Sequence, residues 1–113
     1  MKEENGMKVV ALAKYNTDAW KGMIGSSFQE RKAVMEKVCE SAGAKLTDFM
    51  FTRGEYDVLV IFEVPSEEVA LGAAIAVNAS GAIKDLVTLS EINIDGALET
   101  AKRVASSYAP PGS

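Results

Sequence analysis

Residues 56–64 (YDVLVIFEV) constrain the fold of this chain more than any other segment. Neighbouring side chains of a strand point to opposite faces of a sheet. Alternation therefore gives one face to Val58, Val60 and Phe62 and the other face to Leu59 and Ile61. A strand with one face in water would alternate apolar and polar residues, and this one does not. The segment is therefore predicted to be a central strand that is covered on both faces.

The other segments alternate between strand-like and helix-like patterns. Strands are expected at residues 7–15, 45–52 and 83–94, and the turn between residues 45–52 and 56–64 is expected at Gly54, which can adopt a positive φ. Residues 16–27 contain Gly22 and Gly25 and are too interrupted for a long helix. Ser27 and Glu30 have the spacing of a capping box, which predicts a helix that ends near Gly43. Ser66 and Asp95 are the expected N-caps of two further helices.

This order, β-α-β-β-α-β with an extra C-terminal helix, predicts an α+β fold with a ferredoxin-like antiparallel sheet. Both main helices then cover one face of the sheet, and the apolar second face needs another cover. We expect two subunits to pack sheet to sheet as a dimeric α+β barrel. The C-terminal helix is the alternative cover, on its own sheet or exchanged onto a partner. Residues 69–77 form a helix without a polar side chain, which favours a further contact and a multiple of dimers.

The predicted domain spans residues 7–94, followed by a helix at residues 95–105. Residues 1–6 and 106–113 are expected to be disordered tails. No stretch is long and apolar enough for a membrane span or has the pattern of a signal peptide, so a cytoplasmic protein is expected.

Composition excludes several classes of function. Twelve Lys and Arg against sixteen Asp and Glu give a net charge of −4, which argues against nucleic acid as a partner. The chain has no His, so Ser-His-Asp catalysis and His-ligated metals or haem are excluded. Its single cysteine, Cys39, lies on an apolar helix face and is interpreted as a core residue. No acidic spacing matches a metal-ligand pattern, so neither a metal nor another cofactor is predicted.

The predicted topology brings several polar and aromatic side chains to one end of the sheet. The candidate ligand-binding residues there are Tyr15, Trp20, Arg31, Arg53, Tyr56 and Asp57, with Asn78 and Ser80 close by. Trp20 either packs against the helix or forms a lid over a ligand.

Arg31 is the most informative of these residues, because helical spacing places it within the apolar stripe of its helix. A guanidinium directed at a core needs a partner. One interpretation is a structural ion pair with Asp57, or an Arg that extends to water. The other is an anion clamp for a carboxylate, phosphate or enolate. For Asp57, the alternatives are hydrogen bonds to nearby backbone or a general base with Tyr56 or Tyr15 as proton donor.

The segment at residues 52–57 (TRGEYD) resembles the motif of the GYD-domain family of small bacterial proteins. The resemblance runs from residue 7 to residue 94, and the residues that support it are Tyr15, Thr17, Arg31, Gly43, Gly54, Tyr56 and Asp57. It implies a ferredoxin-like, dimeric α+β fold. The resemblance does not imply an established activity, so it assigns no catalytic residue.

Three classes of function are compatible with these features. The first is a binding or regulatory homo-oligomer that takes a small anionic molecule. The second is a cofactor-free enzyme of the isomerase, lyase or monooxygenase type that acts on a small enolisable compound, an analogy at the level of fold. The third is a structural protein that docks through its apolar helix.

Overall fold

The structure, a computed structural model, describes residues 6–112. Its elements in chain order are β1 (Met7–Tyr15), α1 (Thr17–Ile24), α2 (Phe28–Ser41), β2 (Lys45–Phe51), β3 (Val58–Val64), α3 (Glu67–Ala79), β4 (Ile83–Ser90) and α4 (Ile94–Ser107). The four strands form one sheet in the order β2-β3-β1-β4, and every neighbouring pair is antiparallel. This confirms the predicted α+β class and ferredoxin-like arrangement, with β3 inside the sheet.

Side-chain caps fix where the helices begin. Ser27 Oγ accepts the Glu30 N–H at 3.1 Å, and Ser66 Oγ accepts the Val69 N–H at 3.3 Å, so both predicted N-caps are confirmed. The prediction for the last helix was wrong by two positions, because Asn93 Oδ1 accepts the Gly96 N–H at 3.0 Å and Asp95 lies inside α4. Gly43 adopts φ +75° directly after α2, as a helix-ending glycine does.

The short helix α1 was missed. Asn16 caps it, since Asn16 Oδ1 accepts the Ala19 N–H at 2.9 Å. The helix is only 8 residues long and ends before Gly25, which agrees with the expectation that no long helix fits here. Its role is to carry Trp20 to the end of β1.

The helices α1, α2 and α3 cover the same face of the sheet. Ala13, Val58 and Val60 are buried there under side chains of α1 and α2, among them Ala19, Met23 and Met35. Val9 and Val64 are buried beside Val69 and Ala70 of α3. Strand alternation makes all five buried strand residues neighbours on this one face. The core of the chain is therefore a single layer between sheet and helices.

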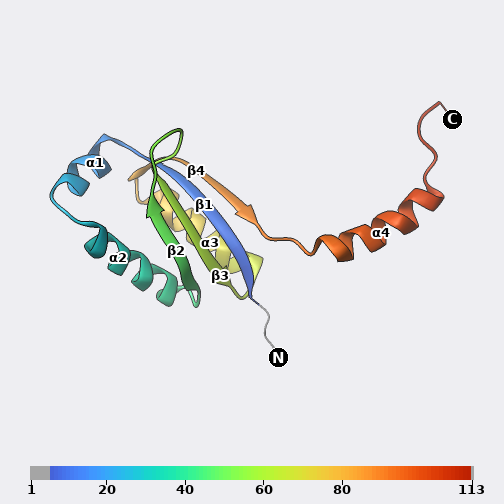
Figure 1. Cartoon of the computed structure of the whole chain (residues 1–113), viewed down its shortest axis with the longest axis horizontal. Helices are drawn as coiled ribbons and strands as arrows, with labels where there is room; N and C mark the ends of the chain where they lie inside the picture. Colours follow the sequence, from blue (N-terminus) through green and yellow to red (C-terminus); the bar gives the residue numbers. More distant parts are fainter. Residues whose placement is uncertain (1–5, 113) are drawn as a thin grey trace.

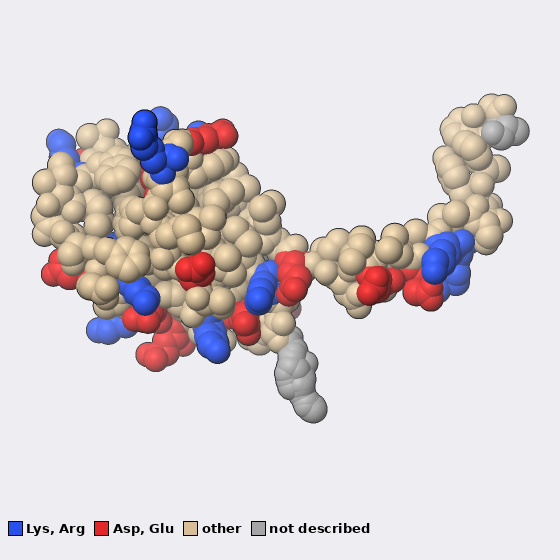
Figure 2. Space-filling model, in the orientation of Figure 1, with Lys and Arg blue, Asp and Glu red and all other residues tan. Residues whose placement is uncertain are grey.

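The opposite face of the sheet, which we call the open face, is largely apolar, and no helix within residues 6–112 covers it. Register and alternation give it Val10, Leu12, Met50, Leu59, Ile61, Val87 and Leu89. Charged residues stand at its ends, where Lys14 lies opposite Asp85 and Lys45 lies opposite Glu63, and on the edge strand β2, where Asp48 lies opposite Ile61. Figure 1 shows the strands in front of α3, and Figure 2 shows in the same orientation a broad tan surface with charges mostly near its margins.

The helix α4 extends away from the sheet (Figure 1), and each of its residues is exposed. The chain measures 61 × 40 × 23 Å with a radius of gyration of 18.2 Å. A compact chain of about this length has a radius of gyration near 13 Å. The alternative in which α4 covers its own sheet is therefore not what the structure has.

Several boundaries differ from the expected ones. β4 ends at Ser90 rather than at residue 94, and α4 runs from Ile94 to Ser107. β3 begins at Val58, so the loop before it is longer than a tight hairpin turn. Of the tails expected to be disordered, residues 1–5 and 113 lie outside the described residues. Within residues 6–112, no helix has the length and apolar character needed to cross a bilayer.

Candidate functional site

Three segments meet at one end of the sheet, as the sequence predicts. The end of β1 is bonded to the turn between α3 and β4, because the Asn16 N–H donates to the Ala82 carbonyl at 3.1 Å. The Asn16 side-chain amide also donates to the Gly81 carbonyl. The loop between β2 and β3 is bonded to β1, because the Asp57 N–H donates to the Ala13 carbonyl at 2.9 Å. These hydrogen bonds hold the end of β1, the turn between α3 and β4 and the loop between β2 and β3 together at this end of the sheet.

Asp57 is used to join the loop to the end of β1. Its Oδ2 accepts the Tyr15 N–H at 2.9 Å, and its carbonyl accepts the Thr52 N–H at 2.8 Å. The pairing of β1 with β3 ends at Ala13 and Val58, so the Tyr15 N–H lies beyond the last pair of this ladder. The carboxylate therefore satisfies an amide that the strand pairing leaves over, which is the backbone role considered for Asp57 in the sequence.

The predicted Arg31–Asp57 ion pair is not formed between the described residues. The guanidinium of Arg31 has a different environment. Its Nε is shut off from solvent and has no hydrogen-bond partner within residues 6–112. Arg31 lies on α2 between Phe28, three positions before it, and Met35, four positions after it, so the three share a helix face. Both neighbours pack against the aromatic residues of the sheet.

Five aromatic side chains form a continuous cluster under α1 and α2. Tyr15 meets Trp20 edge to face with ring centroids 5.4 Å apart, and it meets Phe51 at 6.0 Å. Phe28 stacks on Phe49 at 5.5 Å, and Phe49 meets Phe51 at 5.5 Å. We call Tyr15, Trp20, Phe28, Phe49 and Phe51 the aromatic cluster. Tyr15 and Phe49 are buried, whereas Trp20 and Phe28 keep 40% and 41% of their surface exposed.

The other candidate residues lie elsewhere. Tyr56 is on the side of the open face, because Lys14, which precedes the inward-facing Tyr15, places its Nζ 5.2 Å from the Tyr56 ring centroid. Of the six predicted residues, Tyr15, Trp20 and Arg31 therefore lie on the helix side and Tyr56 lies on the open side. Asp57 joins the loop to the strand, and Arg53 is exposed in that loop. This division separates Tyr56 from Tyr15, the two proton donors considered for Asp57.

The phenylalanines of the cluster were missed as site residues. Phe49 and Phe51 are two positions apart on one strand, which is a signal for a shared face, and Phe28 opens the helix that packs on them. Cys39 is buried as predicted, and this burial raises the pKa of its thiol, which disfavours the thiolate. Within residues 6–112, no group of three or more Cys, Asp and Glu side chains comes together to hold a metal ion.

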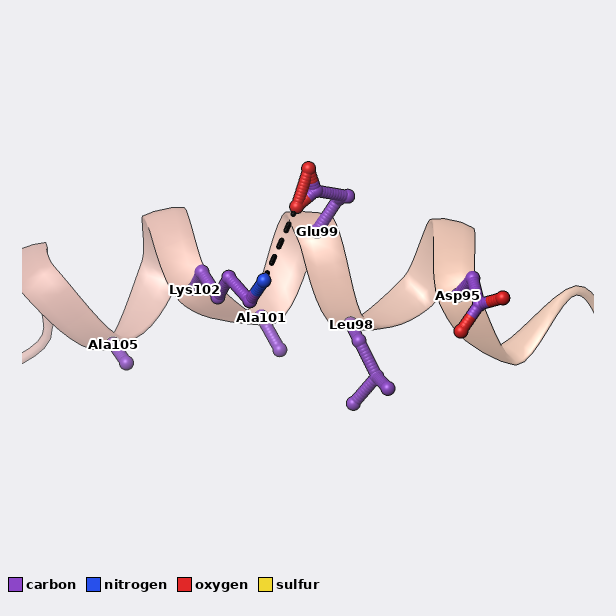
Figure 3. A pocket seen from close by; sticks show the side chains of 6 residues that line it. All are labelled: Asp95, Leu98, Glu99, Ala101, Lys102 and Ala105. Carbon is purple, nitrogen blue, oxygen red and sulfur yellow. Dashed lines mark ion pairs between the residues drawn. The ribbon is translucent and has the colours of Figure 1, made fainter.

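Two surface hollows lie along α4 and its C-terminal end. The first is lined by Asp95, Leu98, Glu99, Ala101, Lys102 and Ala105, which Figure 3 shows from close by. All six come from one helix, so the hollow is the side of an exposed helix rather than a cavity between elements.

Comparisons with known proteins agree with this fold. No curated protein matches the chain. Among solved structures, the crystal structure of MtbAldR superposes with a TM-score of 0.57 at 14% identity, over 80% of this chain and 55% of that one. The chain thus spans little more than half the length of that protein, and the likeness shows the fold alone. The model of the GYD domain matches residues 9–101, past the expected end at residue 94 and into α4. This protein belongs to the GYD domain family.

Proposed function

We propose that this GYD protein is a non-catalytic homo-oligomer that binds a small anionic molecule beside Arg31. The observation that carries the proposal is the Arg31 Nε–H, which is buried without an acceptor among the described residues. A buried donor without a partner costs about 1–3 kcal/mol, and more when it belongs to a charged group. An oxygen of a bound carboxylate or phosphate supplies the missing acceptor in a charge-assisted hydrogen bond.

The aromatic cluster supports a ligand that has an apolar body next to its anionic group. Small-molecule sites combine an apolar wall with a few polar groups that fix orientation. Phe28 lies on the same face of α2 as Arg31, and it is partly exposed, as is Trp20 at the other end of the cluster. Phe28 offers the apolar contact beside the guanidinium, which offers the charge, and Trp20 is linked to this place through Tyr15 and Phe51.

The open face supports the homo-oligomeric part of the proposal. Seven apolar side chains in one continuous surface exceed what a soluble monomer usually exposes, and such surfaces mark interfaces. Pairing two copies sheet to sheet covers both faces of β3, which the sequence of that strand demands. The opposite charges at the ends of the sheet are placed to form a polar rim around this contact.

Fluorescence of Trp20 tests the ligand site directly. It is the single tryptophan of the chain and touches Tyr15 in the aromatic cluster. Benzoate is the probe, inorganic phosphate tests an anion without an apolar body, and benzyl alcohol tests the apolar body without the charge. We expect a saturable change with benzoate and a much weaker one with benzyl alcohol.

The variants Arg31→Met and Arg31→Lys separate the anion site from a structural role. Arg31→Met is expected to keep the circular dichroism spectrum and lose about tenfold or more of the benzoate affinity, since a charge-assisted hydrogen bond is worth about 1.5–3 kcal/mol. Arg31→Lys keeps the charge and is expected to retain part of the affinity. Arg103→Met, on the exposed α4, is the matched control and is expected to bind as the parent does. Undiminished binding by a folded Arg31→Met protein contradicts the proposal.

A further inference from the structure

The helix α4 carries an apolar stripe, and every residue of this helix is exposed. The stripe comprises Ile94, Leu98, Ala101 and Ala105. The gaps between these positions are four, three and four residues, the spacing of a seam between two paired helices. Ile94 and Leu98 are 55% and 49% exposed. Figure 3 shows Leu98, Ala101 and Ala105 on one side of the helix and Glu99 on the other.

The sizes of the side chains along this stripe favour one orientation of pairing. The first half presents the large Ile94 and Leu98, and the second half presents the small Ala101 and Ala105. Two copies of α4 that run antiparallel place Ile94 opposite Ala105 and Leu98 opposite Ala101. Large residues then fill the space left by small ones, which is how close packing is reached. A parallel pair instead places Leu98 against Leu98 and leaves Ala101 against Ala101.

The hollow along α4 has the position that this packing requires. It lies over Leu98, Ala101 and Ala105, the same residues that meet the large side chains of the second copy. Knobs of one helix insert into such holes of the other. Each copy of α4 therefore supplies both the large side chains that insert and the hollow that receives those of the other copy.

The charges beside the stripe favour the same orientation. Asp95 and Glu99 lie in the first half of α4, and Lys102 and Arg103 lie in the second half. At 100° per residue, Asp95 and Lys102 flank the same side of the stripe. An antiparallel pair brings Asp95 of each copy close to Lys102 of the other. It also places the positive end of each helix dipole beside the negative end of the other, which is favourable. A parallel pair places like charges at the same level.

We propose that α4 is an interaction surface for a second copy of this chain, which it meets as an antiparallel helix pair. The apolar outer side of α3, with Leu71 and Ile75 exposed, is a weaker partner, because no charged residue follows Glu68 in α3 to match the charges of α4. The pairing does not depend on the anion site. It uses a surface separate from the open face, so the two contacts together join more than two copies.

Disulfide trapping in the full-length chain tests the pairing and its direction. The background is Cys39→Ala, which removes the single cysteine. One protein carries Ile94→Cys and the other carries Ala105→Cys, with an affinity tag on one of them to distinguish the products. We expect a mixed cross-linked species when the two are combined under mild oxidation, and little cross-linking of either alone. In an antiparallel pair two copies of residue 94 lie about 16 Å apart along the axis, beyond the reach of a disulfide.

Each outcome of the cross-linking experiment either supports or overturns the antiparallel pairing. Efficient cross-linking of each variant with itself indicates a parallel pair and overturns the proposal, and so does the absence of cross-linking in the mixture. A charge exchange gives a second readout in the same assay. Asp95→Lys in both proteins is expected to slow mixed cross-linking, by roughly tenfold if each of the two ion pairs contributes about 0.7 kcal/mol. Adding Lys102→Asp is expected to restore the rate, and failure of this rescue contradicts the assignment of Asp95 and Lys102.

Discussion

Leu59 and Val60 are adjacent in β3 and point to opposite faces of the sheet, so the same substitution tests two different surfaces. Val60 is 6% exposed under the helices, opposite Ala11 of β1 and Phe49 of β2. Leu59 is half-buried on the open face, opposite Leu12 and Met50. We predict that Val60→Asp prevents folding, and that Leu59→Asp leaves a folded chain that no longer pairs through its sheet.

The magnitudes follow from the two environments. Removing the buried Val60 side chain loses roughly 2 kcal/mol of apolar transfer free energy, and burying an unpaired carboxylate adds several kcal/mol more. That sum is a large share of the roughly 5–15 kcal/mol that stabilises a typical domain. Leu59→Asp is expected to change the stability of the single subunit by only about 1 kcal/mol. In a sheet-to-sheet pair it buries two like charges, which weakens association by about a hundredfold or more.

Circular dichroism melting and light scattering after size exclusion measure the two effects. Leu71→Asp is the matched control, since it adds the same charge on the outer side of α3, where the side chain is 60% exposed. The expected pattern is an unfolded Val60→Asp protein, a folded Leu59→Asp protein of reduced mass, and a control of unchanged mass. A Leu59→Asp protein with the parent's mass in a background that lacks the α4 contact refutes pairing through the open face. A stable, folded Val60→Asp protein refutes the assignment of the two faces.

Two further predictions concern single groups. Asp57→Ala leaves the Tyr15 N–H without its acceptor and is expected to lower the free energy of unfolding in urea by about 1–3 kcal/mol. Asp57→Asn retains an acceptor oxygen and is expected to lose less, so equal losses in the two variants contradict the assigned role. Burial raises the pKa of the Cys39 thiol, so the unfolded chain releases this proton at lower pH than the folded one. The stabilising contribution is then complete below about pH 8.5 and is lost as pH rises through the folded pKa. Parent and Cys39→Ala proteins unfolded in urea at neutral and alkaline pH measure it, and an identical pH dependence of the two contradicts it.

The elements that were predicted correctly are those whose signals are local. Ser27 and Ser66 precede helices at the positions where a side-chain oxygen reaches a free amide, and that geometry depends only on neighbours in the chain. The helix α1 and the Asn93 cap were missed because Asn, Thr and Asp satisfy turns as readily as helix starts.

The candidate site was predicted in part. The topology brings the end of β1, the loop before β3 and the turn after α3 together, as expected. The ion pair between Arg31 and Asp57 was wrong: the Asp57 carboxylate accepts the Tyr15 N–H, which lies beyond the last pair of the β1–β3 ladder. Where a ladder ends depends on the register of two strands that are distant in the chain, and the sequence of β1 does not contain that information.

The order of the four strands and of α2, α3 and α4, the ferredoxin-like fold and the two apolar faces of β3 could be predicted from the sequence alone, whereas α1 could not. Periodicity and capping carry this information, because they act between residues that are close in the chain. Only the tertiary structure decided which face the helices cover, which of the six candidate residues share a side of the sheet, and that α4 stands clear of its own domain. These features depend on strand register and on packing between distant segments, where a shift of one residue exchanges one face for the other.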